Sequence, residues 1–343
     1  MMRLPLSWLL AFTTAALALL LLGSLATGPM TLPLGESLRA LFAGQESGIE
    51  SHKLLIVQEI RLPRTLLCIA VGGILGLCGA VMQGLFRNPL ADPGIIGVSG
   101  GAALGAALAI VLLAPLGQQL QATIGVGLLP LLAFLGGALT TTLVYLLGTR
   151  EGGTSVTVML LAGVAITALS GAVIGLLTYL ADDQMLRNLS LWQMGTLAAG
   201  KPADVALALF TLAALLWLFM RDANPLNALL LGEGEARHLG VNVQSLKRRL
   251  ILLTAAGVGV AVAVSGMIGF VGLVVPHLVR LLAGPNHVRL LPLSALLGAA
   301  LLLAADMLAR TLLAPAELPV GIITALLGAP FFIWLLVKGR RAL

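Results

Sequence analysis

The sequence predicts an all-α polytopic membrane protein with about ten transmembrane helices, and its composition is the first reason. Of the 343 residues, 59% are apolar and only 10% are charged, whereas about 25% are charged in a typical soluble domain. The second reason is that the chain contains ten mainly apolar segments near the length of about 20 residues that spans a bilayer. Helices also satisfy their own backbone hydrogen bonds in lipid. A soluble enzyme, a disordered protein and a disulfide scaffold are therefore excluded.

The ten segments form a single predicted transmembrane domain, residues 1–343. The seventh and eighth are separated only by Gly266 to Gly269, so a nine-span arrangement is an alternative. A signal peptide ending at Ala26 is the alternative for the first segment, but its apolar run exceeds the roughly 7–15 residues of a signal sequence. We therefore expect a retained helix. The predicted spans are residues 4–27, 62–85, 94–114, 127–148, 156–180, 203–220, 249–267, 270–283, 291–311 and 320–338.

The basic residues predict the orientation. With both termini in the cytoplasm, roughly two thirds of the 20 Lys and Arg residues lie at inner ends and loops, as the positive-inside rule requires. The longest inner loop is then residues 221–248. Seven basic residues remain outside: Arg39, Lys53, Arg61, Arg64, Arg187, Lys201 and Arg310.

Residues suited to catalysis or metal binding are scarce. Asp306 and Arg310 are four residues apart near an outer span end, where they can pair along one helix face. Cys68 and Cys78 share one span about 15 Å apart, too far for a mutual disulfide. The sequence contains no phosphate-binding loop or nucleophile motif, and His52, His238, His277 and His287 share no metal-ligand spacing. We therefore predict a protein that is not an enzyme, with no permanently bound cofactor and no metal site.

Five segments resemble the FecCD permeases, the membrane subunits of type II ABC importers for iron-siderophores, haem and cobalamin. They are "RLPR" at 61–64, "GAVMQGLFRNPLADPGIIGVSGGA" at 79–102, "GEGEARHLGVNV" at 232–243, "GFVGLVVPHLVR" at 269–280 and "ELPVGIITALLGAPFFIWLL" at 317–336. Any one of them is weak evidence, but five in the right order are specific. The resemblance implies the type II permease fold, with an inverted repeat of the two halves.

The resemblance also implies partners. Family members form homodimers around a central pathway, and two separate ATP-binding subunits, which carry ATP, dock beneath them in the cytoplasm of a bacterial inner-membrane complex. The docking loop follows the sixth span. By this resemblance the coupling residues are Gly232, Glu233, Glu235, Arg237, His238 and Gly240. The residues themselves predict a short helix after Gly234 that carries Glu235, Arg237 and His238 and ends at Gly240. From the residues alone, a solvated connector is the alternative.

On the outer side, the resemblance implies that a periplasmic binding protein presents acidic residues to Arg61, Arg64 and Arg310. Interfacial arginines that reach toward lipid headgroups are the alternative. The resemblance also implies a cytoplasmic gate in the turn before the fifth span, Gly152 to Thr157, with Thr154, Ser155 and Thr157 at the pathway. A short outer helix over Leu189 to Gly195 is expected by the same comparison.

The cargo is the least determined feature. The segment "LADDQMLRNLSLWQMGTLAAG" at 180–200 looks most like haem-importing members, so we expect haem transport, with a ferric siderophore or cobalamin as alternatives. The residues leave two other classes of function as alternatives: an ion-coupled secondary transporter, and a membrane enzyme or scaffold. The first is disfavoured because the spans offer no mid-membrane carboxylate, and the second because no catalytic group of residues can be assembled.

Overall fold

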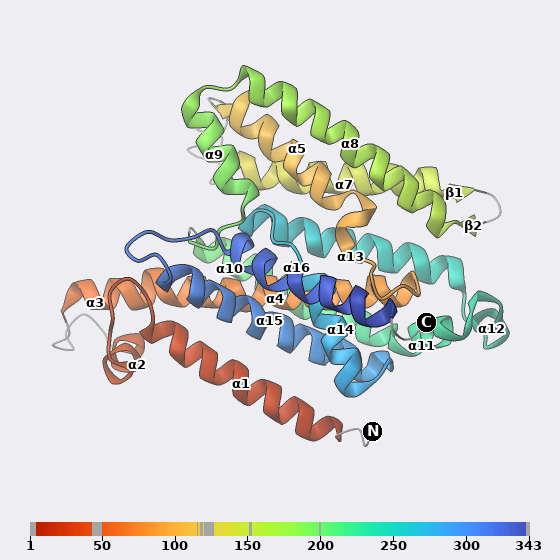
Figure 1. Ribbon diagram of the computed structural model, residues 1–343, viewed down its shortest axis with the longest axis horizontal. Coiled ribbons are helices and arrows are strands. Elements are labelled where there is room, and N and C mark those ends of the chain that lie inside the picture. Colours follow the sequence, from red (N-terminus) through yellow and green to blue (C-terminus); the bar gives the residue numbers. More distant parts are fainter. Residues whose placement is uncertain are drawn as a thin grey trace.

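The computed structural model describes residues 5–42, 50–114, 116, 119, 127–150, 153–198 and 200–340. It is almost entirely helical, with long helices running side by side (Figure 1). A helix lies in each of the ten predicted segments: α1 (Leu6–Ala26), α4 (Leu62–Leu85), α5 (Val98–Val111), α7 (Leu128–Gly148), α8 (Val156–Leu180), α10 (Pro202–Arg221), α13 (Val243–Ser265), α14 (Val271–Ala283), α15 (His287–Thr311) and α16 (Val320–Arg340).

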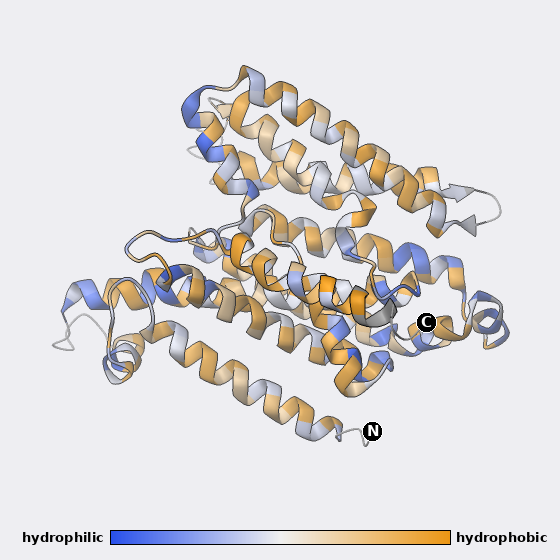
Figure 2. Cartoon of the chain, in the orientation of Figure 1, coloured by the Kyte–Doolittle hydropathy of each residue, from blue (hydrophilic) through white to orange (hydrophobic). Residues whose placement is uncertain are grey.

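Seven of these described helices are long and apolar enough to cross a membrane, and α5, α14 and α16 are shorter apolar helices. Hydrophilic residues gather toward the two ends of the bundle, around α3 and α9 at one end and around α12 at the other (Figure 2). We call these the α9 end and the α12 end. The first turn of α1 and the last turn of α16 both lie toward the α12 end (Figure 1), as an even number of spans requires.

Helix α4 is the centre of the packing. It lies against α15, α14, α10 and α13, and 89% of its most apolar 18-residue stretch is buried. The α4 and α15 backbones approach closely, because a Cβ on Gly72 would lie 2.4 Å from the Gly298 carbonyl oxygen. Small residues permit this approach in lipid. Helices α5, α7 and α8 form a second group beside it.

Several element boundaries differ from the predictions. The span predicted at 62–85 is continued toward its N-terminus by α3 (Ser51–Leu55) and the π-helix η1 (Ile56–Arg61). The segment predicted at 94–114 is interrupted, because the 3₁₀ turn η2 (Pro93–Ile96) is followed by Gly97 at φ +83°. The seventh and eighth spans are separate helices, since Gly266 and Phe270 both adopt positive φ between them.

The remaining elements are short and lie at the two ends. At the α9 end are α2 (Leu34–Phe42) and α9 (Asp183–Gln193). The outer helix expected at 189–195 is part of α9, which starts six residues earlier, at Asp183. It starts there because Asp182 caps the helix by accepting a 2.8 Å hydrogen bond from the Met185 N–H. At the α12 end are the strands β1 (Thr149–Arg150) and β2 (Gly153–Thr154), then α11 (Ala223–Leu231) and α12 (Glu233–His238). The inverted repeat stays a prediction.

Candidate coupling site and gate

The predicted coupling loop forms a compact pair of short helices, α11 and α12. Gly232 joins them at φ +125°, and Gly240 follows α12 at φ +81°, both in a region that favours glycine. After α12 the Gly240 N–H donates to the Arg237 carbonyl and the Val241 N–H to the Ala236 carbonyl, each at 2.9 Å. These two bonds form a Schellman cap, so Gly240 ends the helix as predicted. The helix begins at Glu233 rather than after Gly234.

Helix α11 is fixed to the long helices beside it. Asp222, which precedes α11, accepts a 2.8 Å hydrogen bond from Arg249 Nε of α13. The Asn227 side-chain oxygen accepts a 2.8 Å bond from the His287 N–H at the start of α15. Leu226 and Leu229 are fully or almost fully buried. The α11–α12 unit is therefore joined to α13 and α15 at several points.

The exposed surface of the unit combines charged and apolar side chains. Glu235, Arg237 and His238 are exposed, as a docking role requires. The two leucines that flank α12 are also exposed, Leu231 at 68% and Leu239 at 64%. Apolar groups left uncovered next to charges are typical of a contact surface. We call Leu231, Glu235, Arg237, His238 and Leu239 the α12 tip.

Glu233 differs from the other coupling residues because it is turned toward the bundle. Its Oε1 accepts a 2.7 Å hydrogen bond from Lys247 Nζ of α13. The same Nζ donates to the Thr154 carbonyl at 3.0 Å, and the Gln244 side-chain oxygen accepts a 3.0 Å bond from the Thr154 N–H. The structure therefore brings a predicted coupling residue and a predicted gate residue onto one side of α13.

The turn before α8 is a small hairpin. Thr149 pairs with Thr154 across the two strands, and Ser155 caps α8 by accepting from the Val158 N–H at 3.4 Å. Thr154 is buried, whereas Ser155 and Thr157 are exposed. Gly152, also assigned to this turn from the sequence, lies outside the described residues.

Lys247 and Gln244 were missed by the sequence analysis. The apolar pattern predicts a loop over residues 221–248 and a seventh span that begins at 249, but α13 begins at Val243. The available signal was Asn242, which caps α13 by accepting a 3.1 Å bond from the Ser245 N–H. A helix from 243 places Gln244 and Lys247 on one face, three residues apart.

The predicted docking arginines Arg61, Arg64 and Arg310 are buried near the α9 end, with only 3%, 5% and 2% of their surface exposed. Arg64 donates two hydrogen bonds to Asp306 Oδ1, at 2.8 and 3.0 Å, and one to Glu317 at 2.7 Å. Arg310 Nε lies 3.0 Å from Asp306 Oδ2, so the predicted i,i+4 pair is present.

The third arginine, Arg61, donates to backbone carbonyls at the end of α1, including Leu25 at 2.7 Å and Ala26 at 3.0 Å. All of these contacts lie within the chain, and the docking role of the three arginines stays a prediction. Asp306 of the same chain is the acidic partner of Arg64 and Arg310. Because Arg310 also donates to Ser24 Oγ at 2.7 Å, these contacts hold α1, α4 and α15 to one another.

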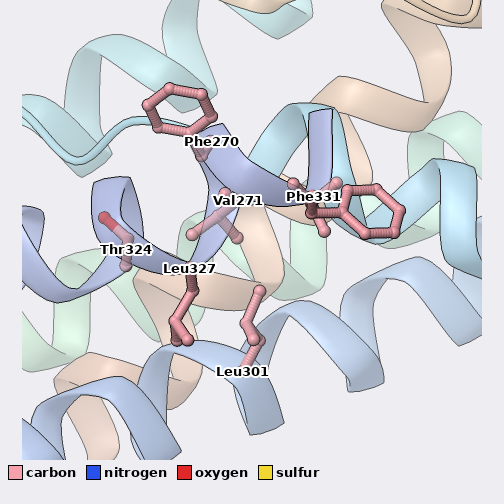
Figure 3. A pocket seen from close by; sticks show the side chains of 8 residues that line it. Phe270, Val271, Leu301, Thr324, Leu327 and Phe331 are labelled. Carbon is pink, nitrogen blue, oxygen red and sulfur yellow. The ribbon is translucent and has the colours of Figure 1, made fainter. Parts of the chain in front are cut away.

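A cavity of about 160 Å³ opens between α14, α15 and α16. Its lining is almost wholly apolar and includes Phe270, Leu301, Leu327 and Phe331, with Thr324 as the polar side chain (Figure 3). Ordinary small-molecule sites have volumes of about 300–1,000 Å³, so this cavity is too small to be a complete site for a macrocyclic cargo. Among the described residues, no group of three His, Cys, Asp or Glu side chains could hold a metal ion.

Comparison with known proteins decides the family. The model of the FecCD transport family matches residues 16–338. The chain belongs to the FecCD transport family. Among curated relatives of this FecCD chain, the hemin transport system permease protein HmuU of Yersinia pestis is 47% identical over 336 residues, 97% of this chain and 96% of the relative. The vitamin B12 import system permease protein BtuC of Vibrio cholerae serotype O1 is 43% identical and covers 83% of each chain.

Solved structures agree with this assignment. A structure described as an inward-facing metal-chelate type ABC transporter superposes on the FecCD chain with a TM-score of 0.82 and 34% identity, covering 97% of this chain and 99% of that one. PsaBC from Streptococcus pneumoniae shares the fold more distantly, with a TM-score of 0.56 and 20% identity over 81% of this chain and 91% of that one. The predicted ABC permease fold is confirmed.

Proposed function

We propose that this FecCD chain is the transmembrane permease subunit of an ATP-driven importer that moves haem across a bacterial inner membrane. The observation that carries the proposal is the 47% identity to the hemin permease HmuU, which extends over 97% of the chain. Cobalamin is the second candidate cargo, because several BtuC relatives are also more than 40% identical. A ferric siderophore is the third, from the sequence resemblance alone.

In this proposal the α12 tip faces the cytoplasm and receives an ATP-binding subunit. Orientation follows from the charge bias, which places the loop between α10 and α13 inside together with both termini. The tip has the mixed apolar and charged surface that docking needs, and the anchors on α11 make the unit stiff enough to move as a body. ATP is bound and hydrolysed by the partner subunits.

We further propose that two copies of the chain enclose the pathway, with α8 facing it. Only 17% of the most apolar 18-residue stretch of α8 is buried within one chain. A Cβ on Gly171 or on Gly175 would contact nothing within 4 Å. Such a helix has room for a second copy beside it. In this arrangement Thr154, Ser155 and Thr157 lie at the inner gate, where α8 begins.

The periplasmic binding protein would dock at the α9 end. Since Arg61, Arg64 and Arg310 are buried there, the exposed cations available to its acidic residues are Arg39, Arg187 and Lys201. Complementary charges of this kind guide docking and set its register more than they add affinity.

The cargo is tested by uptake into proteoliposomes that contain the permease, its ATP-binding subunits and the cognate binding protein. We expect ATP-dependent accumulation of haem that requires the binding protein, and little accumulation of cyanocobalamin or ferrichrome at the same concentration. Preferential uptake of cyanocobalamin would replace haem by cobalamin in the proposal, and no uptake of any of the three would contradict an import role for these cargoes.

A further inference from the structure

We infer that Lys247 is a positioning residue that ties α12 to the turn before α8, so that a displacement of α12 moves the gate. The inference rests on the proposed function, because it explains how docking at α12 reaches the pathway. Its geometric basis is one ammonium group with two partners: Glu233 Oε1 of α12 at 2.7 Å and the Thr154 carbonyl oxygen at 3.0 Å.

The burial of Lys247 makes this contact persistent. Its side chain is only 3% exposed, against 34% for Glu233. An ammonium group removed from water is costly unless it keeps its charge partner and its hydrogen bonds. Separating α12 from the turn would break one of the two bonds and leave the buried charge under-satisfied. A motion in which α12, Lys247 and Thr154 move together keeps both bonds and therefore costs less free energy.

Gln244 adds a second contact between α13 and the turn before α8. It lies one helical turn before Lys247, and its side-chain oxygen accepts the Thr154 N–H at 3.0 Å. Both backbone polar groups of Thr154 are thus held by α13. Thr154 is one residue before Ser155, the N-cap of α8, so a displacement of Thr154 acts directly on the first turn of that helix.

The first experiment measures the link without any partner subunit. Spin labels are placed on the full chain at Gly234→Cys of α12 and Val158→Cys of α8, two positions with exposed surface; Cys68 and Cys78 are buried. In Lys247→Met we expect the distance distribution between the labels to broaden, while Lys247→Arg, which keeps the donors, retains the narrow distribution. Arg248→Met, at the exposed neighbouring position, is the matched control. An unchanged distribution in Lys247→Met would overturn the inference.

The second experiment measures coupling in the assembled transporter. We expect Lys247→Met to lower the cargo moved per ATP hydrolysed by about fivefold or more, with ATP hydrolysis itself retained. The double variant Glu233→Lys with Lys247→Glu restores an ion pair to α12, but a carboxylate at 247 cannot donate to the Thr154 carbonyl, so coupling should stay low. Full coupling in that double variant would show that the ion pair alone matters and would overturn the link to the turn.

Two further outcomes are separable. If Lys247→Met does not insert stably, Glu233→Gln replaces it, because that change removes only the charge of the partner; a narrow distribution and normal coupling in Glu233→Gln would also overturn the inference. If the labels report a broadened distribution but the parent chain shows no ATP-dependent uptake, the proposed function fails while the mechanical link stands. Broadening with normal cargo moved per ATP would refute a role for the link in coupling.

Discussion

Replacing Asp306 by Asn should lower the free energy of unfolding by about 3–5 kcal/mol, because it leaves buried arginines without their charge partner. Asp306 is fully buried and faces both Arg64 and Arg310. Among the described residues, Glu317 is the one acid that remains in the cluster, and its ion pair is with Arg64. The measurement is the midpoint of thermal unfolding in detergent, with unfolding detected as the loss of monodisperse protein.

The matched control is Asp183→Asn, which removes an exposed carboxylate from the first turn of α9. An exposed change of this kind alters stability by about 0.5 kcal/mol or less. If Asp306→Asn unfolded at the same temperature as this control, the cluster would not stabilise the fold. A selective loss of binding-protein docking at unchanged stability would instead support the predicted docking role of the arginines.

The second large effect is expected at the α12 tip. The double variant Arg237→Glu with Leu239→Asp reverses one exposed charge and removes an apolar side chain that is 64% exposed. If the tip is the centre of the ATPase interface, the loss should be about 2 kcal/mol or more, or roughly 30-fold in affinity. The measurement is the amount of ATP-binding subunit that co-purifies with the permease.

Because neither side chain is buried, this double variant should insert and unfold like the parent chain. Asp183→Arg is its control, since it reverses an exposed charge at the opposite end of the bundle. Equal co-purification of the ATP-binding subunit by the tip variant and by the control would place the docking surface elsewhere.

Local patterns predicted the helices well. The fifth span is α8 at 156–180, with the residues expected, because a long apolar run between polar caps has well-defined ends. The position of Gly240 after a short helix predicted a C-cap, because the residue at that position commonly adopts positive φ, which favours glycine. The pair Arg310–Asp306 was also predicted, since it depends only on four-residue spacing along one helix.

Contacts between distant segments could not be predicted in the same way. The charges of "RLPR" resemble surface charges at a span end, because their partners are distant in the sequence. Asp306 of α15, the partner of Arg64, is 242 residues away, and Arg61 donates to the end of α1. Lys247 was hidden for a different reason, because a helix that extends beyond its apolar stretch carries polar residues that hydropathy assigns to a loop. Its partner Thr154 lies 93 residues away.

The central claim is that the chain is a conduit whose energy comes from separate ATP-binding subunits. It is tested most directly by loading proteoliposomes with ATP and comparing haem uptake by the complete complex with uptake by the purified FecCD chain alone. The account predicts uptake only by the complex, retained when a protonophore collapses the proton gradient. Concentrative uptake by the chain alone, abolished by the protonophore, would contradict it.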